Sequence, residues 1–146
     1  MYKEEALNAG ENYHQAAQEL FPDDFFESNL VDWHWVDPFV VNISLACELY
    51  LKSILSDGET EIQGHDLSKL FDELDDEIKT TILSDPHFIG DDQFNNKLEA
   101  SKTLFVDWRY HFEKDKHVHA DLVFLENFAY VLHLIAEREV TSHDQL

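Results

Sequence analysis

Glycine, proline and cysteine are scarce in this chain. Its 146 residues include only four Gly, three Pro and one Cys. Because Gly and Pro most often interrupt regular structure, their scarcity favours long helices over a turn-rich β architecture. The single Cys47 cannot form an intrachain disulfide. Its apolar neighbours Leu45, Ala46 and Leu49 indicate a buried structural thiol rather than an exposed, activated nucleophile.

Basic residues are also few. Ten Lys and Arg stand against 31 Asp and Glu, which gives a formal net charge of −21. Nucleic-acid affinity depends largely on Lys and Arg that neutralise phosphates, so the composition argues against a broad nucleic-acid groove. An acidic surface can instead bind a basic partner or simply confer solubility, and both interpretations stay open.

Signals for export and membrane insertion are missing as well. The N-terminal segment MYKEEALNAGENYHQ holds no apolar run typical of a signal peptide, and no stretch approaches the length of a membrane span. We therefore predict a cytoplasmic protein with no membrane partner. With 44% hydrophobic residues and ordinary domain length, residues 1–146 are predicted to form a single domain with its own core.

Apolar periodicity predicts a bundle of helices with its core at about 38–135. Helices are expected at 3–20, at 38–55, from 67 onward, after Asp75, from 91 or 92 to about 113, and at about 121–139. The first would face inward through Ala6, Ala9, Tyr13, Ala16, Ala17 and Leu20. The last would carry a polar stripe of Glu126, Tyr130, His133 and Glu137. The aromatic connector 21–37 is expected to cap one end of the bundle or to form part of a subunit contact.

The segment 38–55 is apolar at nearly every position. Its polar residues Ser44, Glu48 and Lys52 follow at intervals of four and therefore share one face. A Glu four residues before a Lys is the favourable orientation for an ion pair within a helix. A helix that is apolar on its other sides is expected to be the central one of the bundle.

Residues 42–74 carry the most specific pattern in the chain, NISLACELYLKSILSDGETEIQGHDLSKLFDEL. A helix containing ELYLK precedes an acidic connector, the tetrapeptide GHDL and a second amphipathic helix. This pattern resembles a HEPN domain, the small all-α module found in prokaryotic toxin–antitoxin and phage-defence proteins. The resemblance covers about 38–135. It implies an antiparallel bundle of about five to six helices that forms a homodimer and acts through contacts with a protein partner.

The Gly64-His65-Asp66 junction is the first candidate site. Gly64 permits a backbone conformation that other residues resist, and Asp66 is placed to cap the helix that follows it. His65 can pack on the adjacent helix and hydrogen-bond to the backbone. It can also act as a general base or contact an anion at the helix N-terminus. Both roles of His65 stay open.

The segment WRYHFE at 108–113 is the second candidate. Arg109 and Glu113 are four residues apart, so their side chains can meet on one helical face. An Arg near the edge of the core needs such a partner, because an unpaired buried charge is costly, and Glu48 is the other acidic residue proposed for it. The simplest interpretation is an ion-pair network that joins helices.

The resemblance suggests a second role for Arg109. Ribonuclease-type HEPN domains carry an Arg followed by a His after four to six residues, and the pair cleaves RNA without metal. Here His117 follows Arg109 after seven residues, and His119 comes later still. The motif is therefore interpreted as degenerate. The alternative is a metal-independent endoribonuclease that uses Arg109 with His117, or less readily with His65 or His119, and RNA is a partner only in that case.

A third group has the chemistry of metal ligands. Borderline divalent ions accept His and carboxylate ligands, and the group comprises His111, Glu113, Asp115, His117, His119 and Asp121. The chain has nine His among 31 acidic residues, so such clusters arise easily by chance. A metal-dependent enzyme would need the three His to converge. We predict no metal and no other cofactor, and the chain has no glycine-rich nucleotide loop or zinc-finger spacing.

Overall fold

The computed structural model describes residues 1–22, 35–109 and 121–144. This part of the chain contains seven helices and no strand. The helices are α1 (Tyr2–Leu20), α2 (Val36–Leu55), α3 (Leu67–Asp72), α4 (Asp76–Leu83), α5 (Phe94–Ser101), α6 (Leu104–Arg109) and α7 (Leu122–Asp144). The predicted all-α class is confirmed, whereas the number of helices exceeds the five to six expected.

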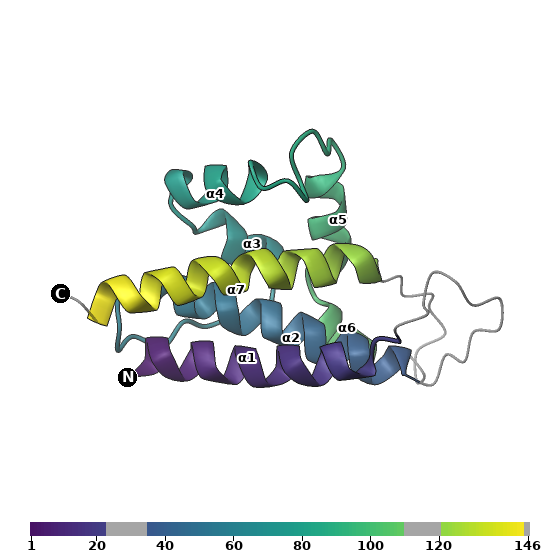
Figure 1. The fold of residues 1–146 in the computed structure, drawn as a ribbon, viewed down its shortest axis with the longest axis horizontal. Coiled ribbons are helices and arrows are strands. Elements are labelled where there is room, and N and C mark those ends of the chain that lie inside the picture. The colour runs from purple at the N-terminus through teal and green to yellow at the C-terminus, as the bar shows by residue number, and fades with distance from the viewer. Residues whose placement is uncertain (23–34, 110–120, 145–146) are drawn as a thin grey trace.

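The long helices α1, α2 and α7 pack against one another, and α3, α4 and α5 lie on one side of this group (Figure 1). α1 runs in the opposite direction to both of the others. α2 and α7 run in the same direction, since Cys47 of α2 contacts Leu125 and Tyr50 contacts His133, further along α7. The expectation of a wholly antiparallel bundle is therefore wrong for this pair.

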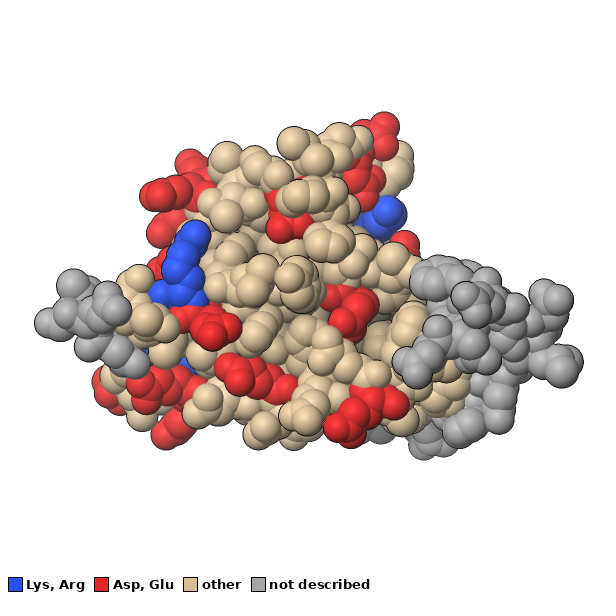
Figure 2. Space-filling view, in the orientation of Figure 1, with Lys and Arg blue, Asp and Glu red and all other residues tan. Residues whose placement is uncertain are grey.

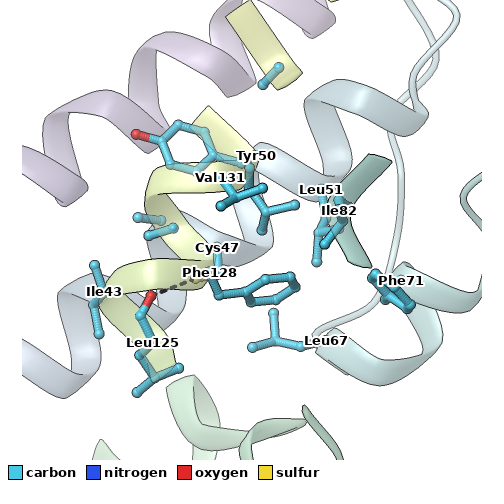
Figure 3. Close-up of a cluster of buried hydrophobic side chains, with 14 of the residues drawn as sticks. Ile43, Cys47, Tyr50, Leu51, Leu67, Phe71, Ile82, Leu125, Phe128 and Val131 are labelled. Carbon is cyan, nitrogen blue, oxygen red and sulfur yellow. Dashed lines mark hydrogen bonds between the residues drawn. The ribbon is translucent and has the colours of Figure 1, made fainter. Parts of the chain in front are cut away.

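α2 is the central helix, as its composition predicts. Its apolar residues Phe39, Val40, Ile43 and Leu51 are fully buried. Figure 3 shows part of the cluster that α2 forms with α7, α3 and α4, which includes Leu67, Phe71, Ile82, Leu125, Phe128 and Val131. The predicted polar face of α2 is buried too, because Ser44, Glu48 and Lys52 are all covered by neighbouring elements.

The length and composition of α2 also meet the criteria for a membrane-spanning helix. This differs from the prediction that no stretch approaches that length. However, 67% of the relevant stretch is buried inside the structure. The core helix of a water-soluble protein has the same properties, so α2 is weak evidence for membrane insertion.

The buried side of α1 differs from the predicted one. The buried residues are Lys3, Ala6, Leu7, Gly10, His14 and Ala17, whereas Tyr13 is exposed. The prediction counted small apolar residues and did not include Lys3, Gly10 and His14. Each of these three has a specific partner in α2, so the inward face of α1 is rotated relative to the alanine stripe.

The predicted helix from 91 or 92 to about 113 is interrupted. α5 ends at Ser101 and α6 begins at Leu104. At this interruption the Lys102 carbonyl accepts a hydrogen bond from the backbone N–H of Leu67 at 2.7 Å. This carbonyl is therefore bonded to the first residue of α3. The final helix also differs from the prediction of about 121–139, because α7 continues to Asp144.

The aromatic connector is described only at its two ends. Phe21 and Trp35 lie with ring centroids 5.4 Å apart, and both rings contact Phe39 in the first turn of α2. The end of α1 is thereby joined to the start of α2. Residues 23–34 of the connector lie outside the described residues, so the choice between a bundle cap and a subunit contact stays open.

Candidate functional site

Glu48, at the middle of α2, is the centre of the first candidate site. Its buried carboxylate contacts Lys52 Nζ through Oε2 at 3.2 Å and His65 Nδ1 through Oε1 at 3.0 Å. The predicted Glu48–Lys52 pair is confirmed. His65 packs on α2 as expected but bonds to this carboxylate rather than to backbone. Because both oxygens of Glu48 have partners, the carboxylate joins α2 to the segment before α3.

The other residues of the Gly64-His65-Asp66 junction have local roles. Asp66 Oδ1 accepts a hydrogen bond from the Lys69 N–H at 3.1 Å, which confirms the predicted N-cap of α3. Gly64 has a φ of +106°, a region that favours glycine. The His65 ring remains 58% exposed and lies 6.3 Å from the ring of Phe105 in α6. The His65 ring is therefore within easy reach of solvent, whereas the Glu48 carboxylate that it contacts is buried.

Arg109 is the last residue of α6, and its side chain lies outside the described part of the structure. The helix that carries it is attached to the start of α2, because Trp108 Nε1 donates a hydrogen bond to Asp37 Oδ1 at 2.9 Å. Glu113, His117 and His119 lie outside the described residues, as does His111. The proposed pairing of Arg109 with Glu113, His117 or His119 therefore stays a prediction.

A second polar cluster joins the three long helices, and the sequence did not single it out as a site. His14 of α1 lies between the other two helices: its Nδ1 is 2.9 Å from Tyr50 Oη, and its Nε2 is 3.4 Å from Glu126 Oε1. Gln18 Nε2 also donates to Glu126 Oε1 at 3.2 Å. The His133 ring lies 5.5 Å from the Tyr50 ring. We call His14, Tyr50, Glu126 and His133 the three-helix cluster.

The three-helix cluster is closely packed and acidic at its margin. A Cβ added at Gly10 would lie 2.8 Å from two carbons of the Tyr50 ring, so α1 approaches α2 closely here. Burial raises the pKa of the Tyr50 phenol, and the nearby Glu11 carboxylate adds to this effect. Among the described residues, Glu126 Oε2 is buried without a hydrogen-bond partner. A neutral Tyr50 held by His14 indicates a structural contact.

Sequence reasoning found part of this cluster. The polar stripe predicted on the last helix contains Glu126 and His133, but no partner on another helix was predicted for them. His14 was missed because it falls outside the alanine stripe of α1. The available signal was that His14 lies on the same side of α1 as Lys3 and Gly10. This spacing indicates a buried polar residue only when α2 is known to cover that side.

The remaining candidates are Cys47 and the group that has the chemistry of metal ligands. The Cys47 side chain is fully buried, and its Sγ donates to the Leu125 carbonyl at 3.8 Å (Figure 3). Burial raises the pKa of this thiol, which confirms the prediction of an unreactive structural cysteine. Within 1–22, 35–109 and 121–144, no group of three or more His, Cys, Asp or Glu could hold a metal ion. The candidate group around His117 lies largely outside these ranges, so the prediction of no metal is not tested there.

Comparison with known proteins gives no match. No protein-family model matches the chain. No curated protein and no solved structure matches it either. The HEPN-like resemblance therefore stays a prediction from the sequence, carried mainly by the 42–74 pattern and next by the segment WRYHFE.

Proposed function

We propose that this protein is a HEPN-like helical module that acts in the cytoplasm through protein–protein contacts. We place it in a defence or toxin–antitoxin-type system, as a homodimer with a degenerate ribonuclease motif. The observation that carries this proposal is the engagement of Glu48, which is buried with both oxygens bound by Lys52 and His65. The most conspicuous polar residues of the pattern thus stabilise the fold, and the net charge of −21 disfavours RNA as the partner.

A metal-independent endoribonuclease is the second candidate. It is favoured by the exposed His65 ring, which lies beside the ring of Phe105. Phe105 belongs to α6, the short helix that ends at Arg109. In such a reaction His65 or His117 would exchange a proton with the attacking 2′-hydroxyl or the leaving oxygen. Arg109 would stabilise the negative charge of the phosphorane.

An RNA cleavage assay separates the two candidates. Purified protein is incubated with single-stranded RNA and a chelator, alongside Arg109→Ala, His117→Ala and His65→Ala. Arg138→Ala is the matched control, because Arg138 is the other Arg of the chain and lies exposed on α7. We expect no cleavage by any of them. Cleavage that Arg109→Ala abolishes and Arg138→Ala retains would establish the ribonuclease and refute our proposal.

The homodimer is tested separately by light scattering. The chain has a mass of 17.1 kDa, so we expect a particle of twice that mass. A particle of 17.1 kDa at micromolar concentration would refute the dimer.

A further inference from the structure

One side of α7 exposes apolar residues where a surface helix normally carries polar ones. Val123, Tyr130 and Leu134 are 44%, 45% and 46% exposed. Their spacing of seven and then four residues puts all three on one face of the helix. They extend over about 16 Å of its length, at 1.5 Å per residue.

The apolar surface continues onto the segment after α4. His87 in this segment lies with its ring 5.7 Å from that of Tyr130, and Phe88 is buried against Phe124 of α7. Next to them Ile89 is 67% exposed, and Leu83 is exposed at the end of α4. Leu83 and Phe88 also line a surface hollow of about 390 Å³.

We define the α7 face by the side chains of Leu83, Ile89, Val123, Tyr130 and Leu134. They are five of the six large apolar residues that are exposed in the described part of the chain, and the sixth is Tyr13 on α1. Single exposed apolar residues need no explanation, but a group of them on adjoining elements marks an interaction site.

The surroundings of the α7 face are acidic. Asp91 and Asp92 line the hollow, Asp85 precedes it, and Glu137 flanks the exposed line on α7. In Figure 2 acidic groups surround a central uncharged area, and acidic groups are more prominent on this face than basic ones. The nearby cations already have partners, since Lys97 pairs with Asp91 at 3.1 Å and Arg138 with Glu139 at 3.3 Å.

This charge pattern determines what can cover the face. A second copy docked on this face would set its own Asp91, Asp92 and Glu137 against the same acidic rim, which is repulsive. A basic partner would place its cations on the rim and its apolar side chains on Tyr130 and Leu134. A straight apolar line of about 16 Å matches about three turns of a partner helix.

We infer that the α7 face binds a basic amphipathic helix of a partner protein. This inference rests on the proposed function in protein contacts and specifies the surface and the class of partner. The apolar anchors would be Val123, Tyr130 and Leu134, and the acidic rim would select Lys- and Arg-rich segments.

The test uses a defined probe. A labelled peptide of about 18 Leu and Lys residues with helical spacing, about 27 Å long as a helix, is titrated into the full chain. An identical peptide with Glu in place of Lys is the charge control. We expect binding of the Lys peptide that weakens with added salt, and no binding of the Glu peptide.

Variants locate the binding surface. Tyr130→Ala combined with Leu134→Ala is expected to weaken binding at least about tenfold, as the loss of central anchors does. Tyr13→Ala, at the exposed apolar residue on α1, is the matched control and should bind as the unaltered protein does. Circular dichroism checks that each variant is folded. An equal loss in both variants, or no loss in either, would overturn the inference.

Two further outcomes separate this inference from the proposed function. If Leu134→Lys converts a dimer into a monomer in light scattering, a second copy covers the face and the inference is wrong, while the dimer stands. If the chain cleaves RNA through Arg109 and still binds the peptide through Tyr130, the proposed function is wrong and the α7 face stands.

Discussion

Replacing Glu48 by Leu is the sharpest test of the structural role assigned to the first site. Glu48 and Lys52 are both buried and lie 3.2 Å apart. Removing the carboxylate leaves the Lys52 ammonium buried without its counter-charge. Breaking a buried pair in this way costs about 3–5 kcal/mol. Against a total stability of about 5–15 kcal/mol for a domain, this loss is large.

The double variant Glu48→Leu/Lys52→Met isolates the pair. It replaces both charges by apolar side chains of similar length, and such replacements of buried pairs are often neutral or stabilising. We therefore expect the double variant to lie within about 1 kcal/mol of the unaltered protein, which means that Lys52→Met restores the stability that Glu48→Leu removes.

Urea unfolding followed by circular dichroism measures these free energies. Glu77→Leu is the matched control, because Glu77 is an exposed helical Glu on α4, and its effect should stay within about 0.5 kcal/mol. A loss below about 1 kcal/mol for Glu48→Leu would refute the reasoning, since an ion pair of that strength is typical of the surface. An equally unstable double variant would show that the cost comes from His65 or from packing.

Three further changes test the packing of α1 on α2. Gly10→Ala should lower the Tm in thermal unfolding or leave it unchanged. The added Cβ would lie 2.8 Å from the Tyr50 ring, and such overpacking costs about 1–3 kcal/mol, which offsets the gain in helix propensity of about 1 kcal/mol. A raised Tm would contradict this. Lys3→Met should lower the unfolding free energy in urea by about 1.5–3 kcal/mol, since Lys3 Nζ donates to the carbonyls of Ser53, Ile54 and Ser56 at 2.8–3.3 Å. Burial raises the pKa of Tyr50 in the folded state, so the unfolded state releases this proton first, and stability should fall above pH 10.0 by up to about 1.4 kcal/mol per pH unit. Tyr50→Phe should reduce this slope in alkaline unfolding, and an unchanged slope would show that the phenol is not responsible.

Some of the site was predictable because its contacts are local. The Asp66 cap depends on a helix start three residues away, and the Glu48–Lys52 pair on one helical turn. Neither requires knowledge of a distant segment. The link from His65 to Glu48 was anticipated only as packing, because the donor and acceptor are separated by a connector whose path sequence periodicity does not describe.

Other features could not be predicted because distant segments produce them. The break between α5 and α6 depends on the Leu67 N–H, which takes the Lys102 carbonyl. The buried face of α1 depends on the α2 carbonyls that bind Lys3 and on Tyr50, which contacts both Gly10 and His14. Hydrophobicity alone assigns such polar and small residues to the surface.

The sequence by itself determined the all-α class, the central position of α2 and the acidic character of the chain. These properties follow from composition and from periodicity within single segments. The tertiary structure alone decided that α2 and α7 run in the same direction, that His14 meets Tyr50 and Glu126, and that Val123, Tyr130 and Leu134 face outward. The physical reason is that a helix with apolar residues on several sides can bury only the side that its neighbours cover.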